Sequence, residues 1–288
     1  MDATRFRVRP GPRVNLRAHD PADTRPFKHK RKAIGRLERG IERLAALQEV
    51  LYAQDRWSVL LIFQAMDTAG KDSAIKHVMS GVNPQGTEVF AFKRPSDEEL
   101  DHDYLWRASK ALPERGRIGI FNRSYYEEVL VVRVHPEVLG RQKLPPPLVT
   151  PRIWNQRFDD INAFERYLAR NGTLILKFFL HLSKEEQRRR LLGRLDEPSK
   201  NWKFEVADLG ERDRWDDYQR AYEQMLSQTS TRHAPWFIVP ADHKWFARLT
   251  IVDLVVAGLD GLGLAFPKLG KAQLDALADA RKRLASER

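Results

Sequence analysis

The stretch SVLLIFQAMDTAGKDS, residues 58–73, decides the fold of this chain. Its first six residues are almost wholly apolar, which is typical of a strand buried on both faces of a parallel sheet. The following segment suits an anion, because Gly70 allows close backbone approach and Lys71 adds a positive charge beside a helix N-terminus. Asp67 offers a carboxylate that can hold Mg²⁺ directly or through water. The stretch therefore predicts a strand, a phosphate-binding loop and a helix, in that order.

This loop departs at two positions from the usual phosphate-loop pattern, G-x-x-x-x-G-K-[ST]. Ala65 replaces the first glycine, Asp72 follows the lysine, and Ser73 comes one residue late. On these residues alone, an ordinary strand-to-helix turn with a surface lysine remains an alternative. The strand before the loop and the helical pattern after it favour phosphate binding.

Short apolar runs recur along the chain and alternate with helical patterns. The alternation predicts an α/β protein whose parallel sheet is covered by helices on both faces. The expected strands are residues 58–63, 88–92, 118–121, 173–179 and 236–239. The expected helices are residues 29–55, 74–79, 101–112, 152–170, 184–195, 212–227, 245–259 and 269–287.

No internal repeat or convincing linker divides residues 29–266, and we expect them to form one domain. Residues 1–28 are rich in Pro and Arg without a clear period, which predicts an extended arm. Residues 267–288 predict a charged helix that lies on the surface or in a subunit contact.

Polar residues also follow the strand predicted at 118–121. Ligands of open α/β sheets bind beyond the carboxyl ends of the strands, so this cluster would lie beside the phosphate loop if the two strands are neighbours. Asn122 stands where phosphate-loop enzymes usually place an Asp that holds Mg²⁺. Glu127 or Glu128 could supply the missing charge, and Arg123 could neutralise a phosphoryl group in transfer. The two glutamates could equally complement a helix dipole.

An arginine-rich helix begins at Ser183, which forms a capping-box pattern with Glu186. Arg190 and Arg194 are four residues apart and share one face, so the pair could grip a phosphate chain. We expect a lid over the site at about residues 183–215. A solvated basic face, paired with nearby acids, is the alternative.

The chain carries 50 Lys and Arg against 39 Asp and Glu, a formal net charge of +11. This excess indicates a polyanionic partner: a nucleic acid, a nucleotide, a phosphate chain or an anionic membrane surface. The absence of cysteine excludes disulfides and thiolate metal sites, and it fits a cytoplasmic location. No apolar run approaches the ~20 residues that span a membrane, so we expect no membrane partner.

Three blocks of the sequence resemble the polyphosphate kinase 2 family. They are residues 64–77 (QAMDTAGKDSAIKH), 121–129 (FNRSYYEEV) and 183–203 (SKEEQRRRLLGRLDEPSKNWK). Residues 81–86 and 92–100 resemble it too, and the likeness runs from about Phe6 to Leu259. Ala65 and Asp72 look normal for this family, and Asn122 resembles its class III members, which act on nucleoside mono- and diphosphates.

The resemblance implies a three-layer α/β/α P-loop kinase fold with a helical lid. It implies reversible transfer of a terminal phosphoryl group from inorganic polyphosphate to AMP or ADP with Mg²⁺, for which Mn²⁺ could substitute. Guanine nucleotides stay open as acceptors, nucleic acid is disfavoured, and a homodimer or homotetramer is expected.

The resemblance also implies roles for individual residues. The expected catalytic residues are Asp67, Lys71, Arg123, Arg190 and Arg194. The expected metal ligands are Asp67, Asn122, Glu127 and Glu128. The expected phosphate or nucleotide contacts are Ala69, Gly70, Lys71, Asp72, Ser73, Lys76, Lys93, Arg123, Arg189, Lys200 and Lys203.

Two rival functions remain on the sequence alone. One is a nucleotide or small-molecule kinase of the P-loop type that uses ATP as donor. The other is a nucleic-acid-binding protein without catalysis, although no helix-turn-helix, zinc-finger or RNA-recognition pattern is present.

Overall fold

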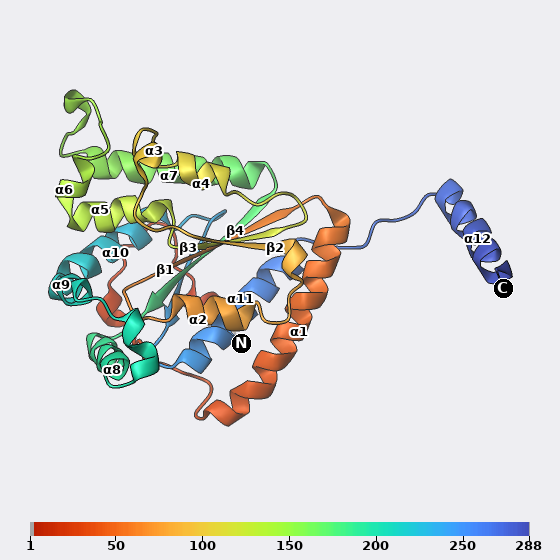
Figure 1. The fold of residues 1–288 in the computed structure, drawn as a ribbon, viewed down its shortest axis with the longest axis horizontal. Helices are drawn as coiled ribbons and strands as arrows, with labels where there is room; N and C mark the ends of the chain where they lie inside the picture. Colours follow the sequence, from red (N-terminus) through yellow and green to blue (C-terminus); the bar gives the residue numbers. More distant parts are fainter. Residues whose placement is uncertain (1–2, 288) are drawn as a thin grey trace.

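Five parallel strands form the central sheet of the computed structural model, which describes residues 3–287 (Figure 1). Residues 1, 2 and 288 belong to the expected arm and the expected C-terminal helix and lie outside the described residues. The strand order is β2-β3-β1-β4-β5, so β1 is central, with β3 on one side and β4 on the other. The strands are β1 (Ser58–Ala65), β2 (Thr87–Ala91), β3 (Ile118–Asn122), β4 (Thr173–His181) and β5 (Trp236–Pro240).

Side chains of β1 alternate between two separate apolar clusters, one on each face of the sheet. Val59, Leu61 and Phe63 belong to the first cluster. Leu60 and Ile62 belong to the second. Each is at most 1% exposed, and burial of one such side chain contributes roughly 1.5–3 kcal/mol. This is why the run is apolar at every position, and it confirms the predicted α/β fold with a parallel sheet.

Helices cover both faces of the sheet and complete three layers (Figure 1). On the first face α1 (Lys30–Gln54) and α11 (Lys244–Asp260) pack closely together. Gly40 permits this approach, because a Cβ at that position would lie 2.5 Å from a Val252 methyl carbon. The first face carries α1 (Lys30–Gln54), α2 (Lys71–Val78) and α11 (Lys244–Asp260). The second carries α4 (Trp106–Lys110), α5 (Val131–Val134), α7 (Ile153–Arg170) and α10 (Trp215–Thr229).

Three expected helices differ from the structure at their N-terminal ends, and the one expected at 74–79 begins three residues earlier, at Lys71. The helix expected at 101–112 is wrong in length, because Asp103 accepts a hydrogen bond from the Leu105 N–H and forms a turn instead. The helix expected at 212–227 begins at Trp215, after Arg214 ends the preceding helix. The shorter elements are α3 (Asp97–Leu100), α6 (Pro136–Leu139), α8 (Lys184–Leu195) and α9 (Ala207–Asp213), with 3-10 turns at Ala3–Phe6, Leu16–Ala18, Pro84–Gly86, Tyr125–Val129, Pro146–Leu148 and Pro198–Lys203.

The N-terminal segment packs along the outer edge of the sheet. The Val8 N–H donates to the Trp236 carbonyl at 2.9 Å, and Arg7 forms an antiparallel bridge with Phe237. Phe6 and Leu16 are buried at 5% and 2% exposure. The edge of β5 is thereby covered, which protects its backbone groups from pairing with another chain.

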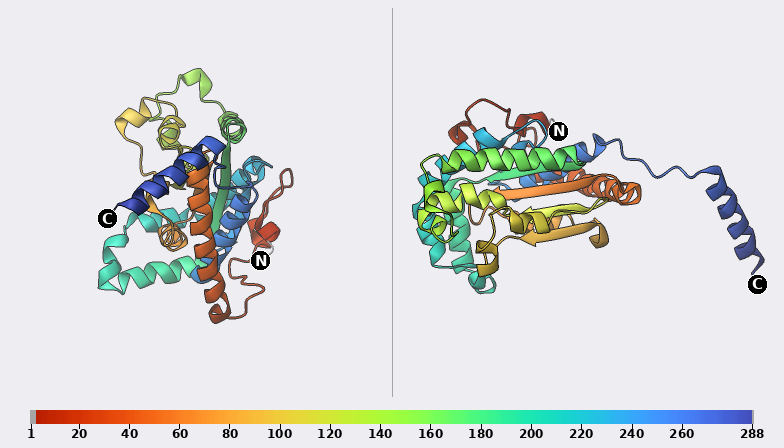
Figure 2. Two further views of the ribbon diagram at one scale, coloured as in Figure 1. Left: turned by 90° about the vertical axis from the view of Figure 1, so that its right-hand side faces the viewer. Right: turned by 90° about the horizontal axis from the view of Figure 1, so that it is seen from above.

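The helix α12 (Lys271–Ser286) projects away from the rest of the molecule at the end of an extended segment (Figure 2). Leu274, Leu277 and Leu284 are exposed along it. No helix within residues 3–287 combines the length and the hydropathy required to cross a bilayer.

Candidate active site

The loop between β1 and α2 forms a tight turn at the carboxyl edge of the sheet. Thr68 and Gly70 have φ angles of +64° and +99°, and a positive φ is easily adopted only by glycine. Gly70 is the N-cap of α2, whose first N–H groups have no partner within the helix. The Lys71 ammonium reaches back across the loop and donates to the Ala65 carbonyl at 3.0 Å. The turn therefore gathers amide donors and one cation around a space suited to an oxyanion.

The residues that follow β3 meet this loop, because β1 and β3 are neighbours. Phe63 pairs with Asn122, and its carbonyl accepts from the Arg123 N–H at 3.0 Å. Arg123 has a φ of +65°, which turns its side chain toward the loop. Its Nη2 lies 3.2 Å from an Asp67 carboxylate oxygen, and Nη1 lies 3.9 Å from Glu127. The expected proximity of the two strand ends is present.

Electrostatics of this cluster favour a bound anion. Burial lowers the pKa of Lys71, and the Arg123 charge lowers it further, while Asp67 opposes both. The nearby Glu127 raises the pKa of Arg123. Two cations are thus held together with limited access to water, and a phosphate group would relieve their repulsion.

The structure separates the two glutamates that the sequence left as alternatives. Glu127 faces Arg123, and burial raises its pKa. Glu128 is 4% exposed and engaged elsewhere, 3.1 Å from the Arg157 Nε and 2.6 Å from the Gln142 amide. Both glutamates line a neighbouring cavity, but only Glu127 also contacts Arg123 of the phosphate-loop cluster.

Asp67, Glu127 and Asn122 carry oxygen atoms of the kind that a divalent cation prefers, and the first two both contact Arg123. Among residues 3–287, no three His, Cys, Asp or Glu side chains are close enough to hold a metal by themselves. Mg²⁺ characteristically takes one or two protein carboxylates and completes its coordination with water and substrate phosphates. The donor set therefore suits a metal that binds together with a phosphate ligand. The Asn122 amide also donates to Asp72 at 2.5 Å, which ties β3 to the start of α2.

A cationic cleft of about 1290 Å³ extends from the phosphate loop. Most of the predicted phosphate contacts line it, while Ala69 is buried inside the loop itself. The cleft is lined by Gly70, Lys71, Asp72, Ser73, Lys76, Lys93, Asn122, Arg123, Arg189, Arg190, Arg194, Lys200 and Lys203, among others.

Four cations of this cleft have no counterpart among the predicted residues. Arg248 donates to the Ser73 hydroxyl at 2.9 Å from α11. The sequence could have indicated Arg94, because it is adjacent to the predicted contact Lys93. The other three cations lie on helices that are distant from the phosphate loop along the chain. The four are Lys30, Arg94, Lys244 and Arg248.

Arg190 lies at the cleft but is saturated by protein acceptors. Its Nη1 donates to the Thr68 and Ala69 carbonyls at 3.1 and 2.9 Å. Its Nη2 donates to the Ala241 and Asp242 carbonyls, and Nε pairs with Glu186 at 2.7 Å. All five N–H groups of the guanidinium are thus engaged, and Arg190 fixes the shape of the phosphate loop in this conformation.

Arg194 lies one turn further along α8 and holds the expected lid segment together. It donates to the Lys203 carbonyl at 2.8 Å and pairs with Asp208 of α9 at 3.3 Å. Both α8 and α9 lie beyond the carboxyl edge of the sheet (Figure 1). The Gln187 amide also donates to the Asp67 carbonyl at 3.2 Å, so α8 contacts the phosphate loop through two side chains, Gln187 and Arg190.

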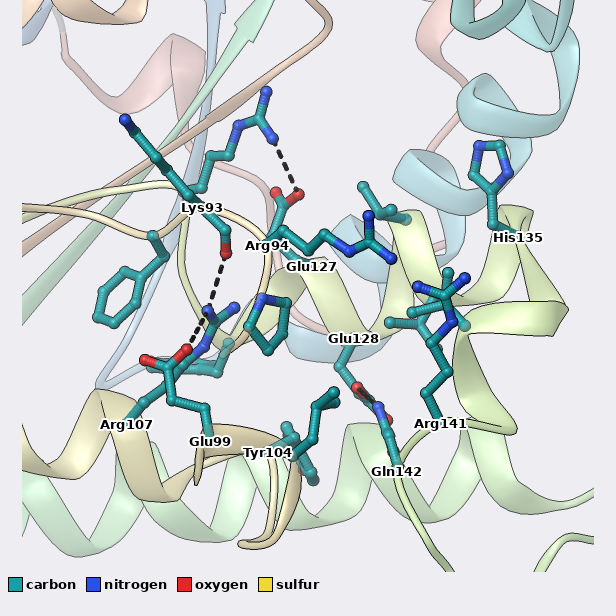
Figure 3. Close-up of a pocket in the computed structure, with 18 of the residues that line it drawn as sticks. Lys93, Arg94, Glu99, Tyr104, Arg107, Glu127, Glu128, His135, Arg141 and Gln142 are labelled. Atoms are coloured by element: carbon teal, nitrogen blue, oxygen red, sulfur yellow. Dashed lines mark hydrogen bonds and ion pairs between the residues drawn. The ribbon is translucent and has the colours of Figure 1, made fainter. Parts of the chain in front are cut away.

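A second cavity, of about 820 Å³, lies beside Arg123 (Figure 3). Phe92 forms part of its wall and is covered by the Arg107 guanidinium at 5.2 Å from the ring centroid. Arg107 also donates to the Lys93 carbonyl at 2.9 Å. Phe92, Lys93, Arg94 and Arg123 line both this cavity and the cationic cleft. The two spaces therefore meet at Arg123.

A family model described as polyphosphate kinase 2 (PPK2) matches residues 28–262. The chain belongs to the polyphosphate kinase 2 family. It is 51% identical over 281 residues to the ADP-polyphosphate phosphotransferase of Rhodopseudomonas palustris, covering 97% of each protein. It is 45% identical to the AMP/ADP-polyphosphate phosphotransferase of Meiothermus ruber, covering 92% of this chain and 95% of that protein.

A solved structure of the same family has the same fold. Polyphosphate kinase 2 from Arthrobacter aurescens TC1 is 41% identical and superposes with a TM-score of 0.87 over 96% of both chains. Membership of the polyphosphate kinase 2 family confirms the resemblance read from the three sequence blocks. It also makes the chain a phosphotransferase with a divalent metal requirement, which agrees with the donors around Asp67.

Proposed function

We propose that this protein transfers the terminal phosphoryl group of inorganic polyphosphate to AMP and ADP, reversibly. The observation that carries the proposal is the meeting of two cavities of different chemistry at Arg123. One cavity suits a long polyanion and the other suits a nucleoside. The relatives in Rhodopseudomonas and Meiothermus, named for ADP and for AMP/ADP, support the choice of acceptors.

The cationic cleft is the proposed site of polyphosphate. It combines the phosphate-loop amides with lysines and arginines from α1, α2, α8 and α11. A string of phosphates needs such repeated contacts, whereas a single phosphate ester would leave many of these cations unpaired. The large formal net charge of +11 would also favour approach of a polyanion.

The second cavity is the proposed site of the acceptor nucleoside. Phe92, covered by Arg107, forms one apolar part of its wall. Tyr104 and Gln142 lie at another wall (Figure 3). Mixed apolar and polar walls of this size are typical of small-molecule sites. A nucleoside in this cavity would direct its phosphate toward Arg123, where the donor cleft begins.

The reaction needs positioning and charge stabilisation more than covalent help. The terminal P–O bond of the polyphosphate chain breaks, a P–O bond to an acceptor phosphate oxygen forms, and the shortened chain leaves as an anion. That acceptor oxygen is already ionised at neutral pH, so no general base is required. Lys71 and Arg123 would bind the equatorial oxygens, which carry the developing charge. Asp67 and Glu127 would hold Mg²⁺, or Mn²⁺ in its place, which supplies further charge neutralisation.

The pH dependence of turnover should report Lys71. Because burial and Arg123 lower its pKa, Lys71 loses its charge at a lower pH than an ordinary lysine near 10.4. We expect kcat/KM for polyphosphate to fall as pH rises through that lowered pKa. Lys71→Arg should move this alkaline limb to higher pH, because arginine stays charged. An identical limb in both proteins would assign the titration to another group.

The two glutamates should differ in their effect on the metal requirement. Replacing Glu127 by Gln should raise the Mg²⁺ concentration for half-maximal activity by ~10–100-fold, the cost typical of a lost metal-supporting carboxylate. Glu128→Gln is the matched control, since Glu128 contacts Arg157 and Gln142 instead. Titration of activity with Mg²⁺ measures both. An equal shift in the two variants would contradict the assignment.

The decisive experiment supplies polyphosphate, Mg²⁺ and AMP and follows ADP and ATP by chromatography. Formation of both nucleotides without any ATP donor supports the proposal. The rival is an ATP-dependent kinase, which would consume ATP with a non-nucleotide acceptor and leave polyphosphate untouched. A parallel assay with GMP and GDP tests whether guanine nucleotides are accepted.

We also propose that the chain forms a homodimer or homotetramer. The exposed leucines of α12 support a subunit contact, because a monomer gains little from an isolated apolar stripe. Light scattering on the full chain and on a chain ending at Phe266 tests this. A cytoplasmic location remains a prediction of the sequence.

A further inference from the structure

A third cavity, of about 410 Å³, lies between α5 and the start of α10. It shares no lining residue with the two cavities that meet at Arg123. Three arginines line it. Among the described residues that line the cavity, Asp217 carries the only carboxylate. Its polar lining consists of Arg133, Arg214, Arg220, Asp217 and Gln224.

Arg133 is the least satisfied of the three arginines. Its Nη1 atom is buried and has no hydrogen-bond partner within residues 3–287. The guanidinium carbon lies 5.8 Å from the Trp154 ring centroid and 6.0 Å from that of Phe158, so aromatic faces orient the group without accepting its hydrogen bonds. A buried unpaired guanidinium N–H is costly, and such groups in native proteins are normally satisfied by another protein group, an ordered water or a bound ion.

The other two arginines leave donors available around the same space. Arg214 donates through Nη1 to the Val134 carbonyl at 3.2 Å. Arg220 pairs with Asp217 and is otherwise exposed to solvent. Glu137 lies outside the cavity, and its pKa is lowered mainly by a hydrogen bond from its own backbone N–H, with a smaller effect of the Arg214 charge. Positive charge therefore exceeds negative charge at the cavity, and its donors come from two different helices.

We propose that this cavity is a second oxyanion site that binds a phosphate group, with the end of a polyphosphate chain as its source. The choice of polyphosphate rests on the proposed function, whereas the oxyanion chemistry rests on the arginines alone. Guanidinium groups pair bidentately with phosphate oxygens, which would satisfy the unpaired Arg133 N–H.

The site lies at the hinge of the expected lid segment. Arg214 joins α9 to α10, and α9 carries Glu211, which lies 3.0 Å from the His135 ring next to α5. A phosphate bound to Arg133 and Arg214 would link α5 to this hinge. Chain ends bound here would thereby favour one position of α9 relative to the acceptor cavity, to which Glu211 and His135 both contribute.

Calorimetric titration of the full chain with tripolyphosphate, without Mg²⁺ or nucleotide, tests the proposal. We expect two classes of site in the unmodified protein. Arg133→Gln should weaken tripolyphosphate binding at least tenfold at the arginine-lined cavity and leave binding at the phosphate loop unchanged. Lys71→Ala should weaken binding at the phosphate loop and leave binding at the arginine-lined cavity unchanged. Arg283→Gln, on the projecting α12, is the matched control and should change neither class.

Several outcomes would overturn the proposal. The proposal is overturned if the unmodified protein has a single class of tripolyphosphate sites. It is also overturned if Arg133→Gln keeps two classes with unchanged affinities. If Arg133→Gln is unfolded by circular dichroism, Arg220→Gln decides, because Arg220 is exposed and its replacement should still weaken the same class several-fold. A parallel titration with orthophosphate separates this proposal from the proposed function. Orthophosphate binding that depends on Arg133 would stand even if polyphosphate proved inert as a donor.

Discussion

Replacing Arg123 by alanine should lower kcat for phosphoryl transfer by ~10³-fold or more. An arginine that neutralises a transferred phosphoryl group is typically worth that much. Arg123 is the one expected catalytic residue that lines both the donor cleft and the acceptor cavity. Its unusual backbone conformation and its contacts with Asp67 and Glu127 fix the guanidinium before substrate binds. Initial rates at saturating polyphosphate, AMP and Mg²⁺ measure the effect.

Arg117→Ala is the matched control for this substitution. Arg117 lies just before β3, and its guanidinium pairs with Glu114 and the Gln85 carbonyl away from both cavities. Its loss should leave kcat within a factor of about two. Arg123→Lys should recover only part of the rate, because an ammonium group keeps the charge but lacks the planar fork. A kcat for Arg123→Ala within tenfold of the unmodified value would remove Arg123 from the mechanism.

Replacing Lys177 by alanine should destabilise the protein by about 3–5 kcal/mol, the usual cost of removing one partner of a buried ion pair. Lys177 and Glu165 are both fully buried, with 2.5 Å between the ammonium and the carboxylate. The ammonium also donates to the Tyr126 hydroxyl and to the Thr229 carbonyl, each at 2.8 Å. Its removal would leave the Glu165 carboxylate without its counter-ion in an apolar interior.

Urea denaturation followed by circular dichroism measures this loss. Burial lowers the pKa of Lys177 to about 8 against the opposing effect of Glu165, so the comparison belongs at neutral pH. The control is the double substitution Lys177→Met with Glu165→Leu, which removes both charges and should recover part of the loss, because the Tyr125 and Tyr126 hydroxyls then lack their acceptor. A double variant no more stable than Lys177→Ala would show that the unpaired Glu165 charge is not the cause of the lost stability.

The same network positions the catalytic segment after β3. Tyr125 and Tyr126 both donate to Glu165, at 2.9 and 2.7 Å, and they follow Arg123 by two and three residues. Nothing in the periodicity of the sequence predicts this role. The only signal is a lysine inside the apolar run of β4, and its acid partner is 12 residues away on another element.

The strands were predictable to within two residues at each end, because a strand of a parallel sheet is covered on both faces and therefore reads as a nearly continuous apolar run. The phosphate loop was predictable because Gly70 and Lys71 act within a few residues of one another. The sequence could not show which of Glu127 and Glu128 faces the phosphate loop. The directions of two adjacent side chains depend on the backbone geometry of the turn that carries them. Arg190 illustrates the same limit, because its acceptors are carbonyls of segments more than 50 residues away along the chain.

The strand pattern, the strand–loop–helix order and the family could be read from the sequence, because each depends on residues that are close along the chain. The glutamate that faces Arg123, the approach of Lys30 and Arg248 to the cleft, and the cavity lined by three arginines depend on how distant segments pack against one another. The physical reason is that charge interactions act through space over a few ångströms. The order of residues along the chain fixes such distances only within a helix, a strand or a turn.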